Sequence, residues 1–377
     1  MTSGSPLNDA MDKIVKDFEQ QTGATVDVVV DQAGYEDAIK VRLASGDIPD
    51  VFATHGWSVM RYSEFLEPLN DREWAQYVNK GLDASMRDAE GNIYAVPLQY
   101  TVAGIGVNFD VLKEAGVDPD GIKTWDDFNA AGEKIKAAGK TVIANSGKDG
   151  LAGNLINFMA SGAFSDDELQ GFLDGTFQSD TYSKLLDMIA QWSADGWFNA
   201  DYVSASTDDV ARSIAEGQSA FIFEQPDTLN TALTYNADAN LGFIPYPNTQ
   251  GEPYLVGGEG IQAYGVSKTS ENKDLALQFV DFLAEPDNAA AVAAAAGSYS
   301  GLTDVTTDLG VLGDSYTKWM EDNSTPTLPF FDRAYLPSGM FDTMKATTDG
   351  VISGQTDTAS ALAQMESQFT SLYGQSN

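Results

Sequence analysis

Helix-like and strand-like segments alternate from the beginning of this chain, and no other feature constrains its fold as strongly. The first segment repeats apolar residues on one helical face, at Leu7, Met11, Ile14, Val15 and Phe18. A strand pattern follows at residues 25–30, a helical segment at 35–45 and a short apolar strand at 51–53. Because short joints connect these segments, the pattern predicts an α/β protein whose parallel sheets are covered by helices on both faces.

The same alternation continues along the chain. Thr124 and Asp127 have the spacing of a capping box, which predicts a helix that begins after Thr124. Residues 274–296 are rich in alanine and predict a helix, and the chain from residue 311 onward is mostly helical. We expect further strands at residues 105–108, 219–223, 241–244 and 261–266.

Length and charge limit the architecture and the partners. At 377 residues the chain exceeds the size at which one hydrophobic core keeps growing, so we expect two lobes. The 56 acidic and 21 basic residues give a formal net charge of −35. A field of this sign repels nucleic acid, phosphorylated ligands and anionic lipid head groups, and it favours neutral or cationic partners. We therefore expect no nucleic-acid partner.

The absence of cysteine and the single histidine, His55, restrict the available chemistry. Disulfides, thiolate metal sites and cysteine nucleophiles are excluded. No Gly-x-Ser-x-Gly elbow supports a serine triad, and the glycine-rich residues 257–260 lack the lysine of a phosphate-binding loop. We expect no metal site, no cofactor and no catalytic residue. A glycoside hydrolase stays open, because two carboxylates suffice for that reaction.

The chain contains no apolar run of about 18 residues, the length that a membrane-spanning helix needs. Its first five residues have neither the basic nor the apolar region of a secretory leader. A mature exported protein and a cytosolic protein fit these observations equally well.

Six stretches follow one another in a characteristic order: FEQQTGATVDVV, ASGDIPDVF, GNIYAVPLQYTVAGIGVNFDVLKEAGV, TWDDF, IAEGQSAFIF and YLVGGEGIQAYGVSKTSENKDLALQFVDFLAEPDNAAAV. Together they resemble the extracellular solute-binding proteins of carbohydrate ABC importers, the family of maltose-binding-protein-like proteins. Each motif alone is weakly specific. Together, in this order, the motifs are a specific signal that extends over nearly the whole chain.

This resemblance implies a periplasmic-binding-protein-like fold of two α/β lobes joined by hinge crossovers, in which closure of the lobes traps a sugar. Lobe one would hold residues 1–106 and 262–308, and lobe two residues 107–261 and 309–377. The ligand would be an oligosaccharide that is delivered to the permease subunits of an ABC transporter. The protein would be a monomer without enzymatic activity, located outside the cell as a membrane-anchored lipoprotein or in the periplasm.

Three features depart from the family pattern. Members carry an apolar strand before the first helix, whereas this chain begins almost at the helix. The lipid-modified cysteine of the exported precursor is not among these residues. A tryptophan often follows the strand of the fifth motif, whereas Phe223 is followed here by Glu224 and Gln225. Because of the last difference, the resemblance does not predict which sugar the protein binds.

Sugars present C–H faces that stack on aromatic rings, and their hydroxyl groups need donors and acceptors in the ring plane. In open parallel sheets, ligands lie beyond the carboxyl ends of the strands. From these positions and from the resemblance we predict the ligand-binding residues His55, Trp57, Gln99, Tyr100, Thr101, Asn154, Glu224, Gln225, Asp227, Gly258, Glu259, Tyr299, Phe331 and Asp332.

Several of these residues also have a purely structural interpretation. Trp57 and Tyr100 would pack in a core, and His55 would bond to the backbone. Asp227 would cap a helix, and Phe331 would pack at the hinge. Core packing is favoured over binding for four other rings, Tyr182, Trp192, Trp197 and Phe198.

The main alternative to an oligosaccharide-binding protein is a binding protein for another neutral or cationic solute, such as a polyamine. A glycoside hydrolase is less favoured, since no pair of carboxylates stands out in the sequence. A ligand-induced rise in melting temperature would distinguish the solutes, and release of reducing sugar would reveal a hydrolase.

Overall fold

The chain divides into two compact units. Unit 1 comprises Met1–Thr101 and Gly258–Gly310, and unit 2 comprises Val102–Gly257 and Val311–Asn377, so the chain passes between them three times. These boundaries lie a few residues from those expected for two lobes. The computed structural model describes residues 6–29, 35–54, 59–88, 90–260, 262–322 and 325–376.

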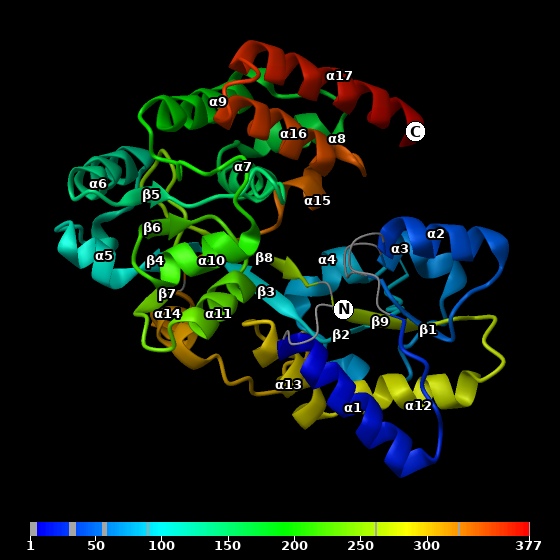
Figure 1. Ribbon diagram of the computed structural model, residues 1–377. Coiled ribbons are helices and arrows are strands. Elements are labelled where there is room, and N and C mark those ends of the chain that lie inside the picture. Colours follow the sequence, from blue (N-terminus) through cyan, green and yellow to red (C-terminus); the bar gives the residue numbers. More distant parts are fainter. Residues whose placement is uncertain are drawn as a thin grey trace. The chain divides into compact units, whose positions relative to one another are not determined.

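Unit 1 is built around a three-stranded sheet in the order β1-β9-β2. The central strand β9 (Ala263–Val266) pairs antiparallel with β1 (Val51–Ala53) and with β2 (Val96–Pro97). Phe18 packs edge-on against Phe279 at 5.0 Å between ring centroids and joins α1 to α12, which lie side by side in Figure 1. The α-helices of unit 1 are α1 (Pro6–Thr22), α2 (Tyr35–Ser45), α3 (Val59–Tyr62), α4 (Asp83–Met86), α12 (Lys273–Leu283) and α13 (Pro286–Ala295), with 3-10 turns at Ser63–Phe65, Glu73–Tyr77 and Lys80–Leu82.

Unit 2 contains a four-stranded mixed sheet in the order β5-β6-β4-β7. β5 (Thr141–Ile143) runs parallel to β6 (Ser219–Ile222), whereas β4 (Ile105–Asn108) runs antiparallel to β6 and to β7 (Leu241–Ile244). Figure 1 shows α16 and α17, the red helices, beside α9. The α-helices of unit 2 are α5 (Phe109–Glu114), α6 (Trp125–Ala137), α7 (Ala152–Ser161), α8 (Asp166–Leu173), α9 (Ser179–Ala194), α10 (Thr207–Ala215), α11 (Pro226–Tyr235), α14 (Gly313–Tyr316), α15 (Phe331–Tyr335), α16 (Met340–Ile352) and α17 (Thr358–Ser376).

A third set of strands has the order β10-β8-β3, from β10 (Thr327–Leu328), β8 (Leu255–Glu259) and β3 (Tyr100–Ala103). β10 runs parallel to β8. β3 and β8 each contain one passage between the units, and the third passage lies in the 3-10 turn Gly310–Leu312. The described residues also include a 3-10 turn at Pro119–Gly121 and a π-helix at Thr317–Asp322.

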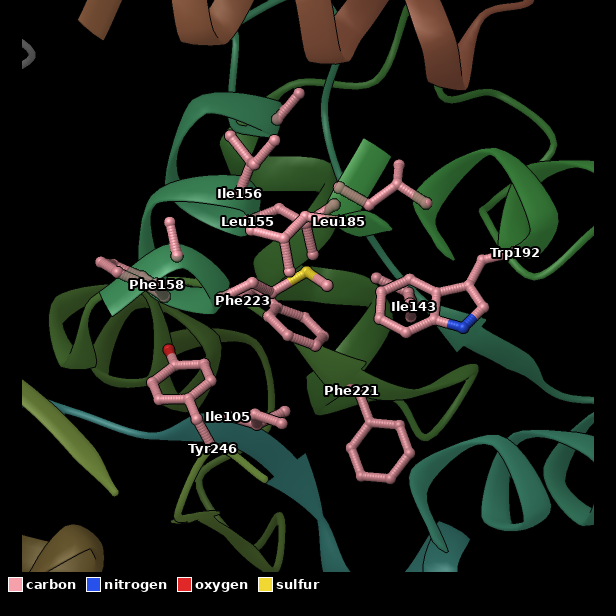
Figure 2. Packing of buried hydrophobic residues seen from close by; sticks show 14 of the residues in the cluster. Ile105, Ile143, Leu155, Ile156, Phe158, Leu185, Trp192, Phe221, Phe223 and Tyr246 are labelled. Carbon is pink, nitrogen blue, oxygen red and sulfur yellow. The ribbon is translucent and has the colours of Figure 1, made fainter. Parts of the chain in front are cut away.

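The core of unit 2 is rich in aromatic rings (Figure 2). Phe128 lies 4.9 Å from Phe221 and 5.3 Å from Trp192 between ring centroids, and Trp192 stacks on Trp197 at 5.8 Å. Tyr182, Trp192 and Trp197 are buried, and Phe198 packs against the same core. The preference for core packing at these four rings is confirmed. Each such ring buries a large apolar surface, which makes the cluster a main source of stability.

Three expectations about the elements were wrong. Residues 25–29 form no strand, and Val28 and Val29 are 44% and 70% exposed, because no neighbouring strand pairs with them among the described residues. The sheets are not parallel throughout, since strands from distant parts of the chain enter between neighbours and run in the opposite direction. The alanine-rich segment 274–296 forms two helices, because Pro286 cannot continue α12 and instead begins α13.

The α/β class itself is confirmed by these sheets and the helices packed on them. Within the described part of the chain, no helix combines the length and the apolar character needed to cross a membrane.

Candidate functional site

One face of α7 holds two carboxyl groups that come from distant segments of unit 2. Asn154 and Asn157 are three residues apart on α7, so their side chains lie on the same side of the helix. Asn154 Nδ2 donates to Glu224 Oε2 at 2.8 Å, and Asn157 Nδ2 donates to Asp332 Oδ1 at 2.7 Å. We call Asn154, Asn157, Glu224 and Asp332 the α7 carboxyl cluster.

Glu224 is the most enclosed member of this cluster. It lies two residues beyond β6 and two before α11, and only 6% of its surface is exposed. Its Oε1 atom is buried and has no hydrogen-bond partner among the described residues. Burial raises the pKa of the Glu224 carboxyl well above its ordinary value, the Asn154 hydrogen bond lowers it, and the charge of Asp227 raises it again.

Gln225 and Asp227 border Glu224 at the start of α11. Gln225 occupies the N-cap position, but its half-buried side chain makes no capping hydrogen bond. Asp227 is exposed, and its Oδ1 accepts the backbone N–H of Thr228 at 2.9 Å in the first helical turn. Asp227 therefore lies inside the first turn of α11 and does not cap it, although a carboxylate in the first turn can stabilise a helix.

Asp332 and Phe331 lie next to each other on α15 but have different surroundings. Asp332 is half-buried, and its backbone N–H donates to Asn157 Oδ1 at 3.0 Å, so Asn157 binds it twice. Burial raises the pKa of Asp332, while Arg333 and Asn157 lower it. Phe331 is fully buried, stacked on Phe164 at 5.1 Å. Its ring packs in the core and offers no surface to a ligand, which corrects the binding role predicted for it.

A second group of predicted residues lies in unit 1. Gln99 is buried, and its Oε1 accepts the backbone N–H of Gln262 at 2.9 Å, so its amide joins two segments that are distant in the chain. The backbone N–H of Tyr100 donates to the carbonyl of Tyr299 at 2.8 Å, which places two half-buried tyrosines beside each other. Tyrosine side chains are of a type that can stack on the C–H faces of sugars.

For the remaining predicted ligand-binding residues, the structure gives the burial of Thr101 and Gly258 only. Thr101 is buried, and Gly258 lies buried in β8 beside Glu259. His55 and Trp57 lie outside the described residues, and the side chain of Glu259 does as well. The binding roles predicted for His55, Trp57 and Glu259 stay predictions.

Asn157 is not among the ligand-binding residues predicted from the sequence, although the sequence contains a signal for it. It is a polar residue in the otherwise apolar run Leu155 to Met159, one helical turn after Asn154. A buried amide in such a position needs partners for both its donor and its acceptor. Asp332 supplies them.

The donor set of this region fits a neutral polyol better than a metal. Among the described residues, no group of histidine, cysteine, aspartate or glutamate side chains could hold a metal ion. Carboxyl groups that are fixed by amides instead provide directed partners for hydroxyl groups.

Residues 4–290 match the family of bacterial extracellular solute-binding proteins. The melibiose/raffinose/stachyose-binding protein MelE of Bacillus subtilis is 30% identical over 320 residues, which cover 82% of this chain and 74% of MelE.

Solved structures are similar over nearly the whole chain. A sugar transporter protein from Bacillus licheniformis in complex with stachyose has 27% sequence identity and a TM-score of 0.87, and the similarity covers 99% of this chain and 98% of that one. The putative binding protein MsmE of Bacillus subtilis, in an open conformation, has 26% identity and a TM-score of 0.86, with 100% and 96% covered.

Proposed function

Because the chain belongs to the family of bacterial extracellular solute-binding proteins, we propose that it captures an oligosaccharide and delivers it to the permease of an ABC importer. The resemblance predicted from the order of the motifs is thereby confirmed. The observation that carries the proposal is the similarity over 99% of the chain to a protein in complex with stachyose.

The substrate class that we propose is the α-galactoside oligosaccharides. MelE is named for melibiose, raffinose and stachyose, and the Bacillus licheniformis protein is bound to stachyose. These sugars share an α-linked galactosyl residue and carry no charge. A neutral ligand also suits a protein of net charge −35, which would repel an anionic one.

Each unit, taken by itself, contains side chains suited to a sugar. The α7 carboxyl cluster of unit 2 offers fixed partners for hydroxyl groups, and unit 1 contains the half-buried tyrosines Tyr100 and Tyr299. A ligand that contacts both units would stabilise a closed state by its higher affinity for that state. Small-angle scattering should then give a smaller radius of gyration with saturating stachyose, and an unchanged curve would contradict closure.

Calorimetric titration with melibiose, raffinose, stachyose, maltose and spermidine tests the substrate class. We expect binding of the α-galactosides, and a ligand at 100 times its Kd should stabilise the native state by about 2.7 kcal/mol. Binding of spermidine alone would instead favour the polyamine alternative, for which the exposed carboxylate Asp227 and the half-buried Asp332 are suitable groups.

We further propose that the protein has no catalytic activity of its own and acts as a monomer. The family consists of binding proteins. Incubation with stachyose followed by a reducing-sugar assay should show no product, whereas steady release would identify a glycoside hydrolase. Sedimentation with and without stachyose checks the monomer.

The family is extracellular, and we propose that the protein is held at the outer face of the membrane by a lipid anchor. Labelling of intact producing cells with a membrane-impermeant reagent should modify the protein. Its recovery from the detergent phase would support an anchor, and its recovery from the culture medium would contradict one.

A further inference from the structure

Glu224 has an arrangement that an ionised carboxylate tolerates poorly. One oxygen, Oε2, accepts the amide N–H of Asn154, and the other, Oε1, is buried without a partner among the described residues. A buried charge without compensating hydrogen bonds costs far more free energy than a buried neutral group. The geometry therefore favours the neutral acid.

The charged and titratable groups around Glu224 act in the same direction. Asp227 on α11 is a second carboxyl group whose charge opposes ionisation of Glu224. Burial and, after it, the charges of Tyr254 and Glu224 raise the pKa of Tyr246, which follows β7 and whose hydroxyl donates to the carbonyl of Gly104 at 3.1 Å. The ten residues of α7 include no titratable side chain. Burial raises the pKa of Glu224 in addition.

We propose that Glu224 binds the ligand as the neutral acid and donates a hydrogen bond from Oε1 to an oxygen of the sugar. This inference rests on the proposed function, because it assigns a role in oligosaccharide binding. It makes Glu224 a specificity-determining residue that recognises an acceptor, whereas a carboxylate would recognise a hydroxyl donor.

The hydrogen bond from Asn154 decides which oxygen carries the proton. Oε2 already accepts from Asn154 Nδ2, so the acid proton belongs on Oε1. An Oε1–H group needs an acceptor, and the ring and glycosidic oxygens of an oligosaccharide are acceptors that carry no hydrogen. A sugar with such an oxygen at this position satisfies the one group that has no partner in the protein.

Some residues that neighbour Glu224 in the chain or bond to it are accessible to solvent. Asp227 is exposed, and Asn154 and Gln225 are half-buried, so the group borders solvent on the side of α11. Because Oε1 is itself covered, we expect the side chains above it to move aside when the ligand binds, while Asn154 Nδ2 stays bonded to Oε2.

The test compares the pH dependence of stachyose affinity in the wild type, Glu224→Gln and Glu216→Gln. Glutamine keeps an acceptor for Asn154 and replaces the Oε1–H donor with N–H, so Glu224→Gln should bind within about threefold of the wild type at low pH. The wild-type Kd should be constant at low pH and then rise by up to about tenfold per pH unit once Glu224 ionises. Glu224→Gln should remove this rise.

Two controls locate the effect. Glu216→Gln changes an exposed glutamate of the same unit, at the end of α10, and should keep the wild-type pH profile. Asp227→Asn removes a neighbouring like charge, which eases the ionisation of Glu224, so the rise in Kd should begin at a lower pH than in the wild type.

The opposite results would overturn the proposal. A loss of affinity of tenfold or more in Glu224→Gln at every pH, as an order-of-magnitude threshold, would show that a carboxylate acceptor is needed. A wild-type Kd that falls with rising pH would show the same. Identical, pH-independent affinities of the wild type and Glu224→Gln would show that Glu224 has no part in binding.

Melting curves without ligand separate this inference from the proposed function. A carboxyl whose folded-state pKa lies above its unfolded-state value stabilises the fold fully at low pH, and this contribution is lost as the pH rises through the folded-state pKa. The wild type should therefore lose melting temperature relative to Glu224→Gln on going from about pH 4 to about pH 9. If the melting temperature falls in this way but no sugar binds, the proposed function is wrong. If sugar binds but the melting temperature does not fall, only the proposal that Glu224 is a neutral acid is wrong.

Discussion

Gly132 on α6 occupies a position in the core of unit 2 that has no space for a side chain. A Cβ atom at this position would lie 2.3 Å from the ring of Trp197, which itself stacks on Trp192. Gly132→Ala should therefore destabilise the protein by about 1–3 kcal/mol, because an overpacked ring cluster has to shift. Urea unfolding followed by tryptophan fluorescence measures the change.

Gly121 offers the matched control. Its Cβ would lie 3.9 Å from the nearest atoms, and its backbone does not need a positive φ. Gly121→Ala should leave stability unchanged or raise it by up to about 1 kcal/mol. If both variants lost the same free energy of unfolding, the contact with Trp197 would not be the cause of the destabilisation in Gly132→Ala.

Asn157 carries a second prediction at the residue scale. Its side chain makes two hydrogen bonds to Asp332, at 2.7 and 3.0 Å, and both residues are at least half-buried. Asn157→Ala should cost about 1–3 kcal/mol of stability. A double-mutant cycle with Asp332→Ala should give a coupling energy of at least about 0.5 kcal/mol, and additive losses would contradict the contact.

The candidate site was predictable from the sequence only in part. Asn154 and Glu224 were proposed as polar residues near the ends of elements, and the structure joins them by a hydrogen bond. The direct pairing could not be predicted, because it links α7 to a segment 70 residues away. Phe331 was assigned to binding because a short aromatic and acidic stretch does not reveal which of its side chains turns into the core.

At the scale of elements, the start of α6 provides a test of local stability. Thr124 Oγ1 accepts the backbone N–H of Asp127, and the Asp127 carboxylate accepts the backbone N–H of Thr124, which confirms the predicted capping box. Thr124→Ala should cost about 0.5–2 kcal/mol. Thr234→Ala, at an exposed position within α11, is the control and should cost nothing.

The capping box also predicts a dependence on pH. Hydrogen bonds from Thr124 lower the pKa of Asp127 below its ordinary value. A depressed folded-state pKa contributes stability at neutral pH, and that contribution is lost as the pH falls through the folded-state value. The difference between wild type and Thr124→Ala should therefore shrink between pH 7 and about pH 3, and a constant difference would contradict the role of Asp127.

Elements with local signals were predictable, whereas pairing between strands was not. The capping box of α6 and the proline that begins α13 act within a few residues, so the sequence contains the whole interaction. The direction of β9 depends on β1 and β2, which lie far away in the chain. Residues 25–29 have the composition of a strand, yet composition cannot supply the neighbour that a strand needs.

At the scale of the whole molecule, the excess of negative charge is the property that composition alone determines. The 21 basic residues cannot pair with all 56 acidic residues, so a large repulsion remains after every ion pair has formed. Ion pairs such as Lys13–Asp17 and Arg87–Asp83 are also partly exposed, and exposed pairs contribute little. The compact state therefore carries a repulsion that the more extended unfolded chain relieves.

Salt should relieve the same repulsion without unfolding the protein. The Debye length falls from about 30 Å at 0.01 M salt to about 8 Å at 0.15 M, so distant like charges no longer interact. The melting temperature at pH 7 should rise by a few degrees over this range, and an unchanged or falling value would contradict the prediction. Near pH 4.1, the isoelectric point expected from the sequence, the net charge is small, and the same salt series should have a much weaker effect. A salt effect of equal size at both pH values would point to ion binding or to a general effect of salt on apolar surface instead of screened repulsion.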